Sequence, residues 1–173
     1  VGIVGNQTEA LEAWAREAAL PADVISSSAS FGVRKPNPAF FERVVDLMES
    51  GVVNGVRKRL NRTKAVGTFA LGTARLHEFL HENTAIELHA VRYVNDPRII
   101  ANEKNFVSVN ATLTVDFLGQ CASETINGRY FSSSGGQNDF ARGAMYSEGG
   151  QGFVVLRSTT SKGTSRIVPQ LAA

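Results

Sequence analysis

Apolar and polar positions along the chain follow two periods, one typical of strands and one typical of helices. The longest strand-like stretch covers residues 106–119, where apolar side chains at every second position alternate with polar ones such as Ser108 and Asp116. Residues 74–82 repeat their large apolar side chains with the helical period, so that these share one face. The pattern predicts a long strand or hairpin with one polar face and, before it, an amphipathic helix.

The other segments alternate in the same way. We expect strands over residues 65–70, 86–94, 152–156 and 165–168, and helices over residues 39–49, 98–102 and 139–145. The first 49 residues predict a strand–helix–strand–helix element, with strands at 1–4 and 23–25 and helices at 8–19 and 39–49. Alternating strands and helices favour the α/β class. We therefore predict an open, largely parallel sheet with flanking helices, to which the short N-terminal element is added.

The composition is that of a globular protein, with 43% hydrophobic and 20% charged residues among 173. No apolar run approaches the roughly 20 residues needed to cross a bilayer, which excludes a membrane span. A net charge of +2 gives no field strong enough to indicate a nucleic-acid partner. The single Cys121 rules out an internal disulfide and predicts a reducing, cytoplasmic location. Because Val1 replaces an initiator methionine, we expect the chain to begin inside a longer parent.

The densest group of basic residues lies between positions 57 and 64. It consists of Arg57, Lys58, Arg59, Arg62 and Lys64. Such a group usually forms a solvated face. The alternative is a site for the phosphates of a nucleotide-containing ligand, and the sequence leaves both interpretations open.

A zinc-binding pattern occurs on the predicted helix at 74–82. His77, Glu78 and His81 satisfy H-E-x-x-H, whose spacing puts two imidazoles on one helix face beside a glutamate. A zinc peptidase also needs a third ligand, for which Glu103 is a candidate. The helix is explained without metal as an amphipathic packing element, so we interpret the pattern as an incidental match and keep the peptidase only as an alternative function.

Several separated segments between residues 44 and 171 resemble the acetyl-CoA hydrolase/transferase family, in particular CoA-transferases of the 4-hydroxybutyrate/acetate type. The segments are VVDLMESGVVN, FALGTARLHEFL, VRYVNDPRIIANEKNFVSVNATLTVDFLGQ, GGQNDFARGAMYSEGG and GTSRIVPQL, in the family's order and at about its spacing. The resemblance implies that residues 46–173 form an incomplete C-terminal domain of such an enzyme. It also implies coenzyme A as a substrate rather than a permanently bound cofactor, with acyl-CoA and a small carboxylate as ligands.

The family's nucleophile is a glutamate six residues before the first valine of VVDL. Its carboxylate takes the acyl group and then CoA, so that one difficult step is divided into easier ones. Counting back from Val44 leads to Pro38, which has no carboxylate. We therefore expect the chain to be inactive alone, although a repositioned Glu42 or Glu49 is an alternative.

The resemblance also implies a glycine-rich oxyanion loop at residues 132–137. Gly135 and Gly136 match its amide donors, and Ser133 stands where the family usually has glycine, which would narrow the acyl pocket. Asn110 and Arg157 match family positions near acyl-CoA. The alternatives are a strand-edge hydrogen bond for Asn110 and a surface charge for Arg157.

Residues 1–45 resemble a different family, the haloacid-dehalogenase-like hydrolases. The segment VGIVGNQ, with Asn6, is similar to the strand of that family's second motif, and Lys35 matches its motif-three lysine. The sequence contains no DxD motif, so phosphoryl transfer is not expected. The two resemblances meet near Val44, which indicates a junction between two fragments. A chimeric, non-enzymatic module that self-associates into a homo-oligomer through exposed apolar edges is therefore a second possible function.

Overall fold

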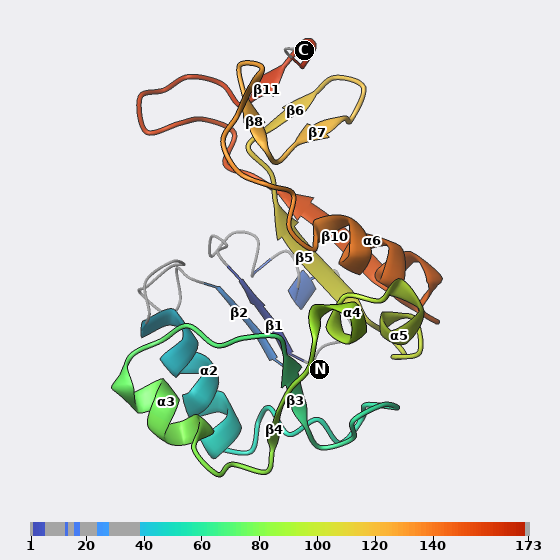
Figure 1. The fold of residues 1–173 in the computed structure, drawn as a ribbon. Coiled ribbons are helices and arrows are strands. Elements are labelled where there is room, and N and C mark those ends of the chain that lie inside the picture. Colours follow the sequence, from blue (N-terminus) through green and yellow to red (C-terminus); the bar gives the residue numbers. More distant parts are fainter. Residues whose placement is uncertain (1, 6–12, 14–15, 18–23, 28–38, 172–173) are drawn as a thin grey trace.

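The structure is a computed structural model that describes residues 2–5, 13, 16–17, 24–27 and 39–171. Helices and strands alternate along this part of the chain, which confirms a mixed α/β composition (Figure 1). The helices are α2 (Ala39–Glu49), α3 (Ala74–Leu80), α4 (Val91–Val94), α5 (Pro97–Ile100) and α6 (Gln137–Tyr146). The strands are β1 (Gly2–Gly5), β2 (Val24–Ser27), β3 (Ala65–Gly67), β4 (Ile86–Leu88), β5 (Val107–Ala111), β6 (Thr114–Asp116), β7 (Cys121–Ala122), β8 (Thr125–Ile126), β9 (Arg129–Tyr130), β10 (Gln151–Val155) and β11 (Ile167–Val168).

Parallel pairing dominates, as the sequence predicts, but the strands form several small sheets. The parallel pairs are β1–β2, β3–β4, β5–β10 and β6–β11, and the antiparallel pairs are β6–β7 and β8–β9. One continuous open sheet is not seen among the described strands. The strands are two to five residues long, and β6 is the described strand that pairs on both sides, with β11 and β7.

The long alternating segment at residues 106–119 is broken, which corrects the expectation of one strand or hairpin. β5 ends at Ala111 and β6 begins at Thr114, and the two strands belong to different sheets. At the break, the Thr112 hydroxyl donates a 2.9 Å hydrogen bond to the carbonyl of Ala122 on β7. The Thr112 amide still donates to the Val155 carbonyl of β10 at 3.0 Å and the Leu113 amide donates to the Ala122 carbonyl at 3.0 Å, so the chain passes from one sheet to the next between these two residues.

The polar face of the same segment turns inward. Ser108, Thr112 and Asp116 are only 3–4% exposed, whereas Phe117 is 73% exposed. Each buried side chain has a partner: the Ser108 hydroxyl accepts a hydrogen bond from Asn110, and the Asp116 carboxylate accepts three from residues 118–120. Local hydrogen bonds thus offset the cost of burying the polar atoms.

Residues 86–94 are only partly a strand, which corrects the predicted strand over that range. β4 can pair only with the three residues of β3, and the last ladder contact is the His89 amide donating to the Gly67 carbonyl at 2.9 Å. Beyond it the backbone satisfies its own groups in α4, where the Tyr93 amide donates to the Ala90 carbonyl at 2.8 Å.

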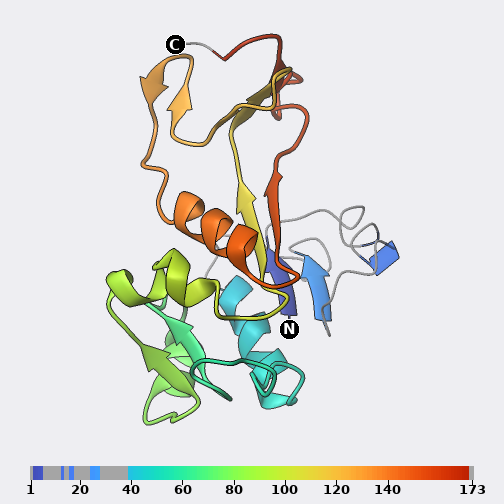
Figure 2. The same ribbon diagram turned by 90° about the vertical axis from the view of Figure 1, so that its right-hand side faces the viewer.

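Helix α6 packs closely on α5 at Gly143 (Figure 2). A methyl group at Gly143 would lie 2.3 Å from Cγ2 and 2.5 Å from Cβ of Ile100, which is itself 4% exposed. Because Ile100 Cβ is fixed by the backbone of α5, the two helices approach this closely only when residue 143 lacks a side chain.

We expect Gly143→Ala to destabilise the fold. Overpacking of this kind costs about 1–3 kcal/mol, and the better helix propensity of alanine recovers at most about 1 kcal/mol. Urea unfolding followed by circular dichroism measures the difference. Gly152→Ala is the matched control, because a methyl group there meets nothing within 4 Å; equal midpoints for the two variants would contradict the packing described here.

Candidate functional site

The predicted glycine loop lies at the amino end of α6, near the carboxyl ends of β5 and β10. The carboxyl end of α6 connects through residues 147–150 to the first residue of β10. Because the helix is about 15 Å long, its amino end lies toward the other end of the strand pair, where β5 and β10 finish (Figures 1 and 2). Ligands usually bind at the carboxyl ends of the strands in parallel α/β folds.

Positions 135 and 136 are suited to glycine for different reasons, Gly135 by its backbone conformation and Gly136 by the lack of space beside it. Gly135 has φ +57°, in the left-handed region, and the space beside it is open for 4 Å. Gly136 is the N-cap of α6. A methyl group on Gly136 would lie 2.4 Å from Asn95 Nδ2 and 3.2 Å from the Phe140 ring. The glycine pair thus has open space beside Gly135 and is bordered at Gly136 by Asn95.

Asn95 is a residue that the sequence analysis did not single out. It is the C-cap of α4, and its Nδ2 donates a 3.3 Å hydrogen bond to Asp139 Oδ2 in the first turn of α6. The contact joins the α4–α5 corner to the helix end that carries the glycine pair. The sequence signal that could have pointed to it is the run Asn95-Asp96-Pro97, which is typical of a turn but does not indicate the partner of Asn95.

Asp96 fixes the same corner as the N-cap of α5. Its carboxylate accepts hydrogen bonds from the side chain of Arg98, at 2.7 and 3.0 Å, and from the Arg98 amide at 2.8 Å. These bonds lower the pKa of Asp96 to about 2, and the bonds from the Arg98 side chain have the largest effect. The corner behind Gly136 therefore keeps its charge pair throughout the neutral pH range.

Ser133 is exposed and lies in the turn before the glycine pair. The Ser132 hydroxyl donates to the Ser133 carbonyl at 3.2 Å, and the Gln137 amide donates to the Ser134 carbonyl at 3.4 Å. The turn is held by its own polar groups, and the effect of Ser133 on the width of an acyl pocket stays a prediction.

Asn110 and Arg157 lie at the same end of the strand pair. Asn110 is opposite Val154 in the ladder, and its Nδ2 donates a 2.7 Å hydrogen bond to the Ser108 hydroxyl. Arg157 is exposed, two residues after β10 ends. Within the described residues, no hydrogen bond joins either side chain to the glycine loop, so their contact with a ligand also stays a prediction.

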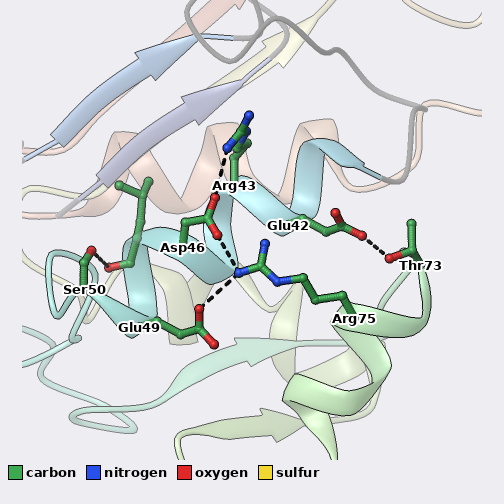
Figure 3. A network of polar contacts seen from close by, with 8 residues as sticks. Glu42, Arg43, Asp46, Glu49, Ser50, Thr73 and Arg75 are labelled. Carbon is green, nitrogen blue, oxygen red and sulfur yellow. Dashed lines mark hydrogen bonds and ion pairs between the residues drawn. The ribbon is translucent and has the colours of Figure 1, made fainter.

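The two glutamates considered as substitute nucleophiles belong to a contact between α2 and α3 (Figure 3). Glu42 accepts a hydrogen bond from the Thr73 hydroxyl, and Glu49 lies 3.1 Å from the guanidinium of Arg75, which is also 2.6 Å from Asp46. Among the described residues, no carboxylate accepts a hydrogen bond from the amides of Gly135 or Gly136. Pro38 lies outside the described residues.

The H-E-x-x-H pattern has no metal site around it in the described part of the chain, where no group of three or more His, Cys, Asp or Glu side chains could hold a metal ion. His77 is exposed on α3 and His81 is its C-cap. The carboxylate of Glu103, the proposed third ligand, accepts hydrogen bonds from the amides of Arg59 and Leu60, at 2.8 and 3.1 Å. Glu103 therefore orders a loop.

Comparison with known proteins identifies the family. Residues 72–173, more than half of the chain, match the model of the acetyl-CoA hydrolase/transferase C-terminal domain. The chain belongs to this family. It is 55% identical over 75% of its length to succinyl-CoA:cyclohexane-1-carboxylate CoA transferase of Geobacter metallireducens, and 43% identical over 74% to 4-hydroxybutyrate coenzyme A transferase of Clostridium kluyveri. It spans 30% of the length of each relative.

A solved structure extends the family likeness over the whole chain. The crystal structure of RipA from Yersinia pestis is 38% identical, with a TM-score of 0.73, and the match covers 100% of this chain and 38% of RipA. The resemblance to CoA-transferases is thus confirmed. A separate dehalogenase-like fragment at residues 1–45 is not supported, and Asn6 and Lys35, its two matching residues, lie outside the described residues. No helix in the described part is long and apolar enough to cross a membrane.

Proposed function

We propose that this chain is an acyl-CoA-binding part of a CoA-transferase, and that by itself it holds the thioester but does not transfer CoA. The observation that carries the proposal is the glycine pair at the amino end of α6, with open space beside Gly135 and with Asn95 bordering Gly136. Amides presented in this way can donate hydrogen bonds to a thioester carbonyl, and these bonds strengthen when the oxygen becomes negative.

The ligand chemistry follows from the family. Both relatives described above carry CoA-transferase names, one acting on succinyl-CoA and cyclohexane-1-carboxylate. For this chain we propose acyl-CoA and a small carboxylate as ligands, with Asn110 and Arg157 beside the thioester. We also propose that the covalent glutamyl step has no nucleophile in this chain, because Pro38 stands at the position of the family's glutamate.

Isothermal titration with butyryl-CoA and with free CoA tests the proposal. We expect butyryl-CoA to bind with a Kd of about 0.1–1 mM, equivalent to about 4–5.5 kcal/mol, and CoA to bind more weakly because it lacks the thioester carbonyl. A coupled assay with butyryl-CoA and acetate should show no transfer above the blank. Absence of heat with butyryl-CoA would contradict the proposed binding. Measurable CoA transfer would contradict the proposed inactivity.

Exposed apolar side chains favour a second candidate, a self-associating module. Phe117, Leu118, Tyr130 and Phe131 are 68–86% exposed around β6–β9. The accessible surface of the chain is 10909 Å², against roughly 8200 Å² for a compact monomer of this mass. Light scattering over a range of protein concentrations measures whether these side chains drive association.

A further inference from the structure

A cavity of about 540 Å³ lies apart from the glycine loop, between α2, α3 and the start of β5. Its apolar wall consists of Met48, Val52, Val53, Phe79 and Phe106. Neither Gly135 nor Gly136 lines it. Cavities of about 300–1000 Å³ with mostly apolar walls and few polar groups are typical of small-molecule sites.

Lys58 is a cation of this cavity that forms no ion pair with a described carboxylate, and Lys64 likewise donates to a backbone carbonyl. Lys58 is half-buried, and its Nζ donates a 3.0 Å hydrogen bond to the neutral carbonyl of Lys64. Within the described residues, no carboxylate lies within 4.0 Å of Lys58 Nζ. Burial lowers the pKa of Lys58, and the more distant charges of Glu103 and Glu87 only partly oppose this effect.

The other charged groups of the cavity are already engaged. The Lys64 ammonium donates to the Thr84 carbonyl, Lys104 pairs with Glu148 at 2.6 Å, and both oxygens of Glu103 accept backbone amides. Lys58 therefore keeps donor capacity for a ligand, since an ammonium can donate three hydrogen bonds. An anion beside it would offset the cost of its burial.

We propose that this cavity binds a monocarboxylate with an apolar chain, with the carboxylate at Lys58 and the chain against Met48, Val53 and Phe79. The Lys58 ammonium beside an apolar wall matches one negative charge and a hydrocarbon body. The phosphates of a nucleotide would need several donors. The basic group at residues 57–64 is thus not a uniform solvated face, because Lys58 lines the cavity while Arg59 pairs with Glu148 at 2.8 Å.

Methyl NMR of the full chain can test the site with octanoate as the probe. The sequence has two methionines, so a sample labelled with ¹³C at the methionine methyl groups gives two signals. Met48 lines the cavity, whereas Met145 is 68% exposed on α6. We expect octanoate to shift the Met48 signal in a saturable way and to leave the Met145 signal in place, with Met145→Leu assigning the two.

Two comparisons separate carboxylate recognition from apolar partitioning. Lys58→Leu keeps an apolar side chain, removes the charge, and should raise the octanoate Kd about tenfold, while Lys162→Leu, at an exposed position outside the cavity lining, should not change it. 1-Octanol should bind the parent chain about tenfold more weakly than octanoate. A silent Met48 signal up to 10 mM octanoate, on the order of a weak Kd, would overturn the proposal, and so would equal Kd values for the Lys58→Leu and Lys162→Leu variants. Because the probe contains no CoA, either result leaves the proposed acyl-CoA binding untouched.

Discussion

Replacing Gly136 by alanine is expected to weaken butyryl-CoA binding about threefold to tenfold while leaving the fold intact. The added methyl group would lie 2.4 Å from Asn95 Nδ2 and 3.2 Å from the Phe140 ring, so the end of the Asn95 side chain has to shift and the turn has to adjust to the ring. A hydrogen bond to the neutral thioester carbonyl contributes about 0.5–1.5 kcal/mol, and 1.4 kcal/mol is tenfold in affinity. Isothermal titration of the variant measures the change.

A second substitution supplies the control. Asn95→Ala removes the amide that the methyl group meets, so the double variant Gly136→Ala/Asn95→Ala should bind butyryl-CoA more tightly than Gly136→Ala alone. Such non-additivity is expected only for side chains in contact. If Gly136→Ala bound butyryl-CoA like the parent chain, the glycine pair would not be the thioester site.

Asp116→Ala is expected to lower the melting temperature by roughly 5–10 °C. Asp116 is 3% exposed, and its carboxylate accepts hydrogen bonds from the amides of Leu118 and Gln120, at 3.0 and 2.9 Å, and from Gln120 Nε2 at 2.9 Å. Alanine leaves these donors without an acceptor in a turn that joins β6 to β7. Thermal unfolding monitored by circular dichroism gives the shift.

Asp116→Asn separates the effect of the carboxylate charge on stability from the effect of the hydrogen bonds that hold the turn. Burial raises the pKa of Asp116, but the hydrogen bonds from Gln120 and Leu118 outweigh it and hold this pKa below its usual value. The carboxylate therefore stabilises the fold at neutral pH, and this stability is lost as the pH falls through the lowered pKa. Asp116→Asn should melt between the parent and Asp116→Ala and lose this acid dependence; a melting temperature equal to that of the parent for both variants would contradict the described role.

Element positions with strong local signals were predictable from the sequence. α2, α3, α5, α6 and β10 lie close to their predicted ranges, because each has a clear period or a boundary residue. The β8–β9 hairpin was missed although its signal is present: Asn127 and Gly128, both with positive φ, form the Asn-Gly turn that connects short antiparallel strands.

The arrangement of strands into sheets depended on contacts that the pattern does not contain. The alternation at residues 106–119 is real, but a period of two does not say which face is buried. The polar face turns inward because the Thr112 hydroxyl donates to the Ala122 carbonyl and the Asp116 carboxylate accepts from the Gln120 amide. These partners come from β7 and its turn, which the pattern alone could not assign.

The residues of the candidate site were also only partly predictable from the sequence. Gly135 and Gly136 were found from the family motif, whereas Asn95 and Lys58 were not, because their importance depends on what lies beside them. Asn95 follows a different helix from the one it supports, and Lys58 matters because it is half-buried in the wall of a cavity and forms no ion pair with a described carboxylate.

The amide signals of the glycine pair test the central claim most directly. In a sample labelled with ¹⁵N-glycine, which reports on 16 residues, the Gly136 signal can be assigned from its loss in Gly136→Ala. We predict that butyryl-CoA shifts the amide signals of Gly135 and Gly136 in a saturable way, and that free CoA at the same concentration shifts them much less. Signals of the pair that stay in place while butyryl-CoA binds elsewhere on the chain would contradict the account.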